Sequence, residues 1–399
     1  MQSKTSALYA VGILTFFFTI FDGILAYVVP VTIISQGYSK TALGFILGTS
    51  SFAGAIGDIF LSKFLKTSNF RRLFLAMYAC ALLYVTILSQ ANIIILYLLA
   101  MAFWGLYFDF KSFATFNFVG RFTPHRLHAL SFGIIDVFKC LGYVIAPIIA
   151  GLVIIGTVTD QPFIIAFVFL IFSLISYFGL ILLTKKIKEQ GLLKKKNYGL
   201  LLEINTWRRL GKIIWPVLIF TVLISINDSF FWTVGPLISE QLSQVSQFGW
   251  LFLTLYFLPT VIVGWFVGRI TKRFGKKRTA FVSFALGSLF LTLIGFLGNS
   301  WLILVFIFIS SSFAAIAWPA SNAAYADYIE ESPHLEQEIE GVSDFAYNFA
   351  YVIGPITAGV LADTFGNSMT LTIFGVVGVL VCIILLVVTP KRIHVPNRI

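Results

Sequence analysis

The sequence predicts an all-α membrane protein in which twelve transmembrane helices form two pseudo-symmetric six-helix bundles. Three observations support this fold class. Hydrophobic residues make up 58% of the 399 residues and charged residues 11%, whereas soluble domains contain about 25% charged residues. Apolar stretches of about 20 residues, long enough to cross a bilayer as a helix, recur along the chain. Segments of the first half also recur in the second half. The composition excludes a soluble enzyme, a disordered chain and a nucleic-acid-binding module.

The apolar stretches divide the chain into two sets of six spans on either side of a long polar segment. The expected spans are 7–35, 41–66, 72–90, 92–121, 127–156, 162–185, 210–240, 246–272, 277–298, 300–330, 336–364 and 367–389. We therefore expect an N-terminal bundle over residues 1–185, a cytoplasmic central loop over 186–209 and a C-terminal bundle over 210–399.

The positions of the basic residues predict the orientation of these spans. With both termini in the cytoplasm, 25 of the 28 Lys and Arg residues lie in cytoplasmic segments and only Lys40 lies in an outer one. Cytoplasmic loops of membrane proteins carry this excess of positive charge. We expect a multi-pass protein of the cell membrane with both termini inside.

Two segments show that the halves are copies of each other. Asp22–Pro30 (DGILAYVVP) aligns with Asp228–Pro236 (DSFFWTVGP) at an offset of 206, and Tyr143–Gly151 (YVIAPIIAG) aligns with Tyr351–Gly359 (YVIGPITAG) at an offset of 208. Segments in register across almost a whole half indicate an internal duplication. Two similar bundles can rock against each other around a site near the midplane of the membrane.

With these features the sequence resembles the major facilitator superfamily over nearly its whole length. In that family the loop after the second helix of each half usually reads G-x-x-x-D-R-x-G-R-R. Gly268, Lys272, Arg273 and Gly275 match this spacing, with Lys272 where the family has Asp. The family's loop is associated with a latch that closes the cytoplasmic side, so the resemblance implies a gating role for these residues. The equivalent loop after the second span of the first half matches the family pattern poorly. Asp58, one turn before that loop, is the expected substitute for the missing acid.

The fifth span carries a second family pattern. Drug-antiporter branches often have G-x8-G-x3-G-P-x2-G-G there, and this chain matches it around Pro147 with two Gly-to-Ala changes; the eleventh span repeats the series around Pro355. Small residues let helices approach closely and proline bends a helix, so both prolines are candidate gating residues. The fourth span departs from the antiporter pattern, because Met101 stands where many drug antiporters have Arg. The resemblance implies proton-coupled export of an amphipathic compound, with proton-coupled import of a polar metabolite as the alternative.

Ionisable residues inside the apolar spans are the candidate coupling groups, because charges at membrane depth are costly and mark functional sites. The candidate proton carriers are Asp22, Asp109, Asp136, Asp228 and Asp344. The alternative is a structural ion-pair network that holds helices together.

The two lysines at membrane depth are expected to pair with carboxylates of the N-terminal bundle. With a helical rise of 1.5 Å per residue, Lys111 comes level with Asp136 and Asp109 with Lys139, about 20 Å from the turn between their spans. We expect a four-charge cluster here, with Asp22 as the nearest candidate to join it. The C-terminal bundle has no matching lysines, so Asp228 and Asp344 lack an evident basic partner there.

In the superfamily, helices one, four, seven and ten line a central cavity, which implies a set of substrate-contacting residues. These are Tyr27, Trp104, Tyr107, Phe231, Trp232, Trp318 and Asn322. We expect a monomer whose partners are a small-molecule substrate, protons and the lipid bilayer, and we expect no nucleic acid, cofactor, nucleotide or metal. A membrane-embedded enzyme or a receptor is the alternative from another functional class.

Overall fold

The structure is a computed structural model that describes residues 2–65, 69–123, 127–154, 159–185, 200–246, 248–332, 335–390 and 393. Within these ranges, the side chains of residues 2–4, 58–65, 129, 200–205, 264–265 and 337 are not described. The described part of the chain forms twelve α-helices and contains no β-strand.

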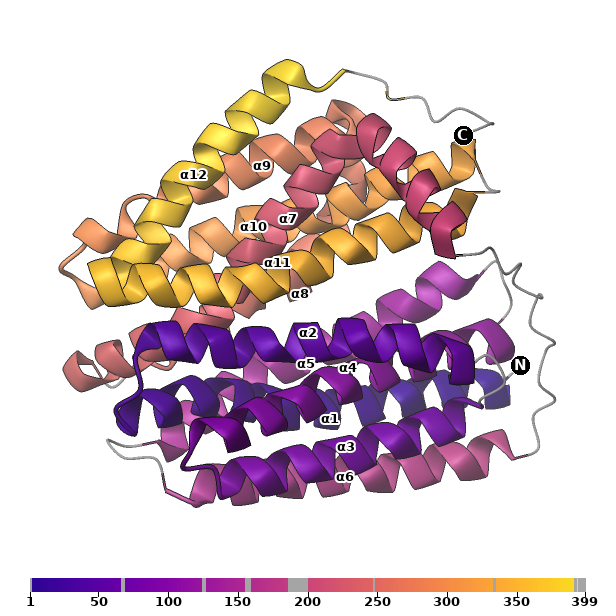
Figure 1. The fold of residues 1–399 in the computed structure, drawn as a ribbon, viewed down its shortest axis with the longest axis horizontal. Helices are drawn as coiled ribbons and strands as arrows, with labels where there is room; N and C mark the ends of the chain where they lie inside the picture. Colours follow the sequence, from indigo (N-terminus) through magenta and orange to yellow (C-terminus); the bar gives the residue numbers. More distant parts are fainter. Residues whose placement is uncertain are drawn as a thin grey trace. The chain divides into compact units, whose positions relative to one another are not determined.

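The helices follow the predicted spans closely (Figure 1). They are α1 (Gln2–Ser35), α2 (Lys40–Leu65), α3 (Phe70–Ser89), α4 (Ile94–Phe122), α5 (His128–Val153), α6 (Gln161–Thr184), α7 (Leu200–Val245), α8 (Leu251–Phe274), α9 (Lys276–Leu291), α10 (Ser300–Glu331), α11 (Glu336–Phe365) and α12 (Asn367–Val388). Ten described helices are long and apolar enough to cross a membrane, and α8 is an eleventh when its two parts count as one span. The predicted all-α membrane fold is confirmed.

The start of α7 differs from the expected central loop. Residues 186–199 of that loop lie outside the described residues, but the helix already begins at Leu200, ten residues before the expected span. Trp207 in this extension lies against α11, with its indole ring next to Gly341 and 6.3 Å from the Phe345 ring centroid. The adjacent Arg208 and Arg209 make the segment look like a polar loop in the sequence.

The described helices group into two compact units. The first comprises Met1–Lys194 together with Ser239–Thr254, and the second comprises Lys195–Ile238 together with Leu255–Ile399. The segment Ser239–Thr254, from the end of α7 and the start of α8, belongs to the first unit because its side chains contact α1 and α5. Tyr27 donates a hydrogen bond to Ser239, and Thr254 donates to the carbonyl oxygen of Val144. The boundaries of the two bundles stay a prediction.

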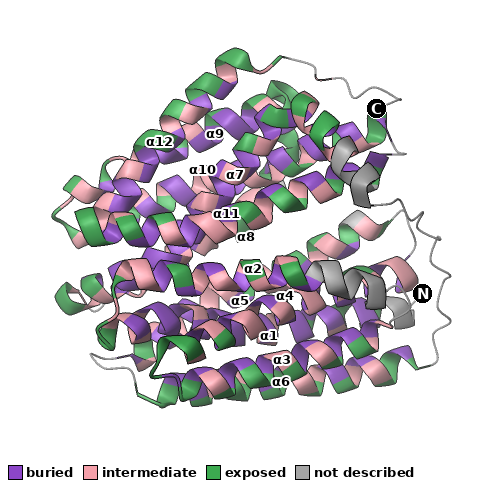
Figure 2. Ribbon diagram, viewed as in Figure 1, coloured by how far each residue is buried: buried purple, intermediate pink, exposed green. Residues whose placement is uncertain are grey.

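Equivalent helices make equivalent contacts inside each unit. In the first unit α3 contacts α4 and α6, and in the second unit α9 contacts α10 and α12, the helices at the same positions of their halves. The close approach of α2 and α4 depends on Gly105, because a Cβ atom there would overlap the backbone carbonyl oxygen of Ser50. Buried and exposed residues alternate around the helices (Figure 2). Large apolar side chains on the exposed faces, such as Leu182 and Val387, suit a surrounding of lipid.

Candidate functional site

Asp22 is the best-enclosed carboxylate among the predicted coupling residues. It lies in the middle of α1 and its exposed fraction is 1%. Three donors from two other helices bind it. Trp104 Nε1 donates to Oδ1 at 2.9 Å, the Tyr107 hydroxyl also donates to Oδ1, and the Tyr143 hydroxyl donates to Oδ2 at 2.8 Å. An ionised carboxylate only accepts hydrogen bonds, so three converging donors suit its charged form.

Asp228 has a similar surrounding in the second unit. The Tyr256 hydroxyl of α8 donates to Oδ1 at 2.8 Å, and the Tyr351 hydroxyl of α11 donates to Oδ2. The amide nitrogen of Asn227 lies 3.5 Å from the Tyr256 hydroxyl, and the Phe231 ring stacks on the Tyr256 ring at a centroid distance of 3.8 Å. Asp228 is therefore bound by two phenols, a kind of partner that the sequence analysis did not predict.

The two clusters share one contact at equivalent positions. Asp22 and Asp228 are repeat equivalents, and so are Tyr143 and Tyr351, and in both units the tyrosine donates to the aspartate. Sequence reasoning singled out both aspartates but neither tyrosine. A signal was present, because each tyrosine is the first residue of a repeated segment, YVIAPIIAG or YVIGPITAG.

The small residues beside these clusters form a second repeated contact. Gly23 of α1 faces Ala146 of α5, whose Cβ would lie 2.6 Å from a Cβ added to the glycine. In the second unit Ser229 of α7 faces Gly354 of α11, where an added Cβ would overlap the serine Oγ. Gly23 and Ser229 are repeat equivalents, and so are Ala146 and Gly354. The glycine of the pair is on the first helix in one half and on the fifth helix in the other, but both residues of each pair are small. The small residues of the fifth-span pattern therefore let the helix with the tyrosine approach the helix with the aspartate.

The predicted pair of Lys111 and Asp136 is absent from the structure. Asp136 bonds to Lys139 on its own helix at 2.6 Å, with side-chain exposed fractions of 60% and 39%. Lys111 is 6% exposed, and its Nζ has no hydrogen-bond partner among the described residues. The rise per residue predicts the height of a residue along a helix, but it does not fix the side of the helix from which the side chain projects.

The remaining predicted coupling residues have different surroundings. Asp109 is half-buried on α4 and lies against Gly54 of α2, where an added Cβ would be 2.9 Å from Oδ2. Its pairing with Lys139 stays a prediction. Asp344 lies on an exposed part of α11, and its role as a proton carrier stays a prediction.

The predicted substrate-contacting residues divide into two groups. Tyr27, Tyr107 and Phe231 are at most 1% exposed and belong to the packed interior. The others, Trp104, Trp232, Trp318 and Asn322, are partly or fully exposed. Contact with substrate stays a prediction for all seven.

The predicted latch residues lie at the junction of α8 and α9. Gly268, Lys272 and Arg273 are exposed near the end of α8, and Gly275 connects the helices with φ +83°, a conformation that favours glycine. The ion pair of this region is formed by the next residue, because Lys276 Nζ contacts Asp327 of α10.

The other predicted gating residues lie within helices. Pro147 and Pro355 are buried in α5 and α11. Asp58 belongs to α2, but its side chain lies outside the described residues. The gating roles of all these residues stay predictions.

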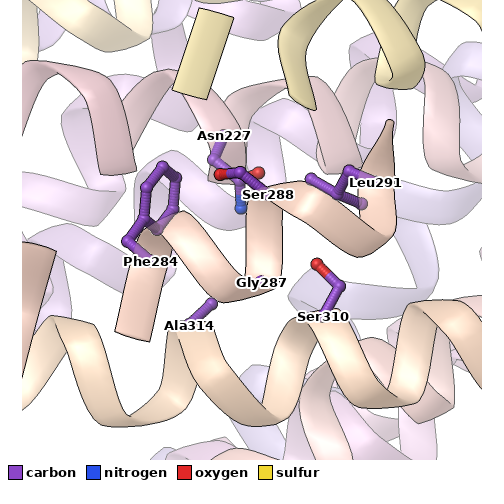
Figure 3. A pocket seen from close by; sticks show the side chains of 7 residues that line it. All are labelled: Asn227, Phe284, Gly287, Ser288, Leu291, Ser310 and Ala314. Carbon is purple, nitrogen blue, oxygen red and sulfur yellow. The ribbon is translucent and has the colours of Figure 1, made fainter. Parts of the chain in front are cut away.

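A small pocket in the second unit lies next to the Asp228 cluster (Figure 3). It is lined by residues of α7, α9 and α10: Asn227, Phe284, Gly287, Ser288, Leu291, Ser310 and Ala314. Asn227 Oδ1 and Ser288 Oγ have no hydrogen-bond partner among the described residues. Asn227, which carries one of these unsatisfied oxygens, directly precedes Asp228 in the chain.

Three solved structures similar to this chain are transporters. A D323A mutant of the nucleoside transporter NupG superposes with a TM-score of 0.77 at 13% identity, covering 96% of this chain and 100% of that one. A POT family transporter in complex with a thioalcohol-conjugated peptide gives 0.71 at 17% identity, covering 96% of each chain. A bacterial homologue of the human lysosomal transporter Spinster, inward-facing and unoccupied, gives 0.70 at 13% identity, covering 96% of this chain and 95% of that one. At these identities the likeness shows the fold.

No curated protein matches the sequence. The family model of the Major Facilitator Superfamily matches residues 11–225 and again residues 217–398. Together the two matches cover nearly the whole chain, once for each half. This multi-pass membrane protein therefore belongs to the major facilitator superfamily.

Proposed function

We propose that this protein is a secondary active transporter that couples the movement of a small molecule to protons, and that Asp22 and Asp228 accept the protons. The observation that carries the proposal is the repeated contact in which a tyrosine of the fifth helix of each half donates to a carboxylate of the first helix of that half. The same arrangement in both halves provides two chemically similar proton acceptors.

Protonation at these positions changes the hydrogen bonding between helices. Each carboxylate accepts bonds on both oxygens, and a proton would convert one oxygen into a donor. The bonds that this oxygen accepts would then weaken or reverse. Because Asp22 connects α1 with α4 and α5, and Asp228 connects α7 with α8 and α11, proton occupancy is linked to the packing of three helices in each unit. A ligand that binds two conformations unequally shifts their populations, and in this proposal the proton is such a ligand.

The first candidate direction is export of an amphipathic compound, supported by the fifth-span pattern around Pro147. The second candidate is import of a polar solute with protons. It is supported by the polar groups gathered around Asp22, and by the similarity to a nucleoside transporter and to a transporter with a bound peptide conjugate. In both cases we propose a monomer in the cell membrane with cytoplasmic termini, in which Asp109, Asp136 and Asp344 assist proton movement.

Purified protein in liposomes that contain a pH-sensitive dye would test coupling and direction together. We expect the transport of at least one compound from a varied set to be accompanied by proton movement. Protons should move opposite to the compound if the protein is an antiporter, and in the same direction if it is a symporter. Asp22→Asn and Asp228→Asn should abolish this proton movement while substrate binding persists. Asp160→Asn, at an exposed position before α6, is the matched control and should behave like the wild type. Unchanged proton movement in both cluster variants would contradict the proposal.

A further inference from the structure

Lys111 is a buried cation without a hydrogen-bonded anion. Its side chain is 6% exposed, and Nζ makes no hydrogen bond to the described residues. Instead, Nζ lies 4.5 Å from the ring centroid of Phe108 and 5.4 Å from that of Phe18. A cation–π contact offsets only part of the cost of removing an ammonium group from water. An anion that bound Nζ would therefore stabilise the charged form of Lys111.

The carboxylates packed around Lys111 do not supply that anion. Asp22 attracts the ammonium group electrostatically, but its three bonds come from donors of α4 and α5 and none comes from Lys111 Nζ. Asp136 is exposed and bonds to Lys139. Asp109 lies against Gly54 on the side of α4 that faces α2. Lys111 keeps its own donors available, while Asp22 and Asp136 bond to other side chains.

The neighbours of Lys111 on α4 indicate the kind of anion. Trp104, Phe108 and Lys111 follow each other at spacings of four and three residues, which places them on one face of the helix. The Trp104 and Phe108 rings stack at a centroid distance of 5.8 Å, and both side chains are partly exposed. An aromatic surface that ends in an ammonium group matches a molecule with an apolar body and one negative charge.

We propose that Lys111 binds the carboxylate of an amphipathic organic acid, with the apolar part of the molecule against Trp104 and Phe108. The flexible four-carbon chain of lysine lets Nζ turn from the Phe108 ring towards this face. A single ammonium group suits a monoanion, and the nearby Asp22 carboxylate disfavours a dianion such as a phosphate monoester. This inference rests on the proposed transport function and specifies the substrate class at the same site.

Ligand-induced thermal stabilisation of the purified full-length protein in detergent would test the proposal. The probes are matched pairs of an acid and its amide, indole-3-acetate with indole-3-acetamide and benzoate with benzamide, together with phenyl phosphate. A hydrogen bond to a charged group predicts about tenfold tighter binding of at least one acid than of its amide. We expect Lys111→Met to remove this preference and Lys111→Arg to retain part of it. Lys212→Gln, at an exposed position of α7, is the control and should keep the preference.

The proposal is overturned if the wild type binds no acid more tightly than its amide, if phenyl phosphate binds more tightly than both carboxylates, or if the preference survives in Lys111→Met. The first two outcomes need no variant. Methionine also fills the space between two phenyl rings without a charge, and buried charges are often replaced by apolar residues without loss of stability. Binding is measured without a proton gradient, so a failure of this test would not contradict the proposed proton coupling through Asp22 and Asp228. Likewise, a failure of the liposome assay would not contradict the binding of an organic acid at Lys111.

Discussion

The hydroxyl group of Tyr143 donates a hydrogen bond to the carboxylate of Asp22, between the fifth and the first helix of the N-terminal half. The equivalent residues of the second half, Tyr351 and Asp228, make the same bond. Since the two segments that contain these residues are also the best-preserved repeats of the sequence, the duplication has retained a contact between side chains as well as the arrangement of helices.

We expect each Asp–Tyr pair to stabilise its unit by a measurable coupling energy. Tyr143→Phe should lower the free energy of unfolding by about 1.5–3 kcal/mol, the range for a hydrogen bond to a charged group. In a double-mutant cycle with Asp22→Asn, the two losses should not add, because either substitution weakens the same bond. Unfolding measured in detergent should show the same behaviour for Tyr351→Phe with Asp228→Asn.

A matched control separates the loss of the bond from the loss of a hydroxyl group. Tyr9 is 47% exposed, and Tyr9→Phe should change stability by less than 0.5 kcal/mol, as is usual for surface positions. If the losses from the Asp22 and Tyr143 variants were simply additive, the two residues would not be coupled energetically.

The small pair next to each aspartate predicts a compensating substitution. Gly354→Ala should destabilise the protein by about 1–3 kcal/mol, because the new methyl group would overlap Ser229 Oγ. Adding Ser229→Gly recreates the Gly–Ala pair that the first half forms between Gly23 and Ala146. Thermal unfolding of the double variant should recover most of the loss.

Gly133→Ala is the control for this experiment, since nothing lies within 4 Å of a Cβ atom at that helical position. Alanine favours helix over glycine by about 1 kcal/mol, so this variant should be as stable as the wild type or more stable. A Gly354→Ala variant as stable as Gly133→Ala would show that α7 and α11 do not approach as closely as the structure places them.

The exposed ion pair between Lys276 and Asp327 predicts an effect on transport rather than on stability. The side chains are 36% and 51% exposed, and pairs of this kind contribute about 1 kcal/mol or less. Asp327→Asn should therefore leave the melting temperature nearly unchanged but alter the rate of transport in liposomes, if this junction has the gating role that its loop motif implies. Exchanging the charges, with Lys276→Asp and Asp327→Lys together, should return the rate towards that of the wild type. If the double variant transported no faster than either single variant, the ion pair would have no role in gating.

The sequence predicts the helices well because each needs only a long apolar stretch between polar ends, and these signals are local. It predicts the wrong partner for Lys111 because the height of a residue along a helix follows from counting, whereas the direction of its side chain depends on how two helices are rotated against each other. Tyr143 and Tyr351 were missed for a related reason. The chain contains 15 tyrosines, and only the folded structure shows which of them face a carboxylate.

The start of α7 illustrates a further limit. The ten residues from Leu200 to Arg209 contain four charged or amide side chains among apolar ones, and periodicity in so short a segment distinguishes poorly between a loop and a helix. The contact of Trp207 with Gly341 and Phe345 supplies the packing that a helix of this length needs. Tertiary contacts of this kind are not visible in the local sequence.

The orientation in the membrane gives the last prediction. With both termini in the cytoplasm, Ser89 at the end of α3 and Asn299 before α10 lie on the outer side of the membrane. Cysteine placed at either position should react with a membrane-impermeant maleimide added to intact cells. The native Cys80, Cys140 and Cys382 are partly or fully buried, so the wild-type protein supplies the background for the measurement. If these cysteines reacted only after the cells were opened, the predicted orientation would be wrong. The side from which protons reach Asp22 and Asp228 would then also be the opposite one.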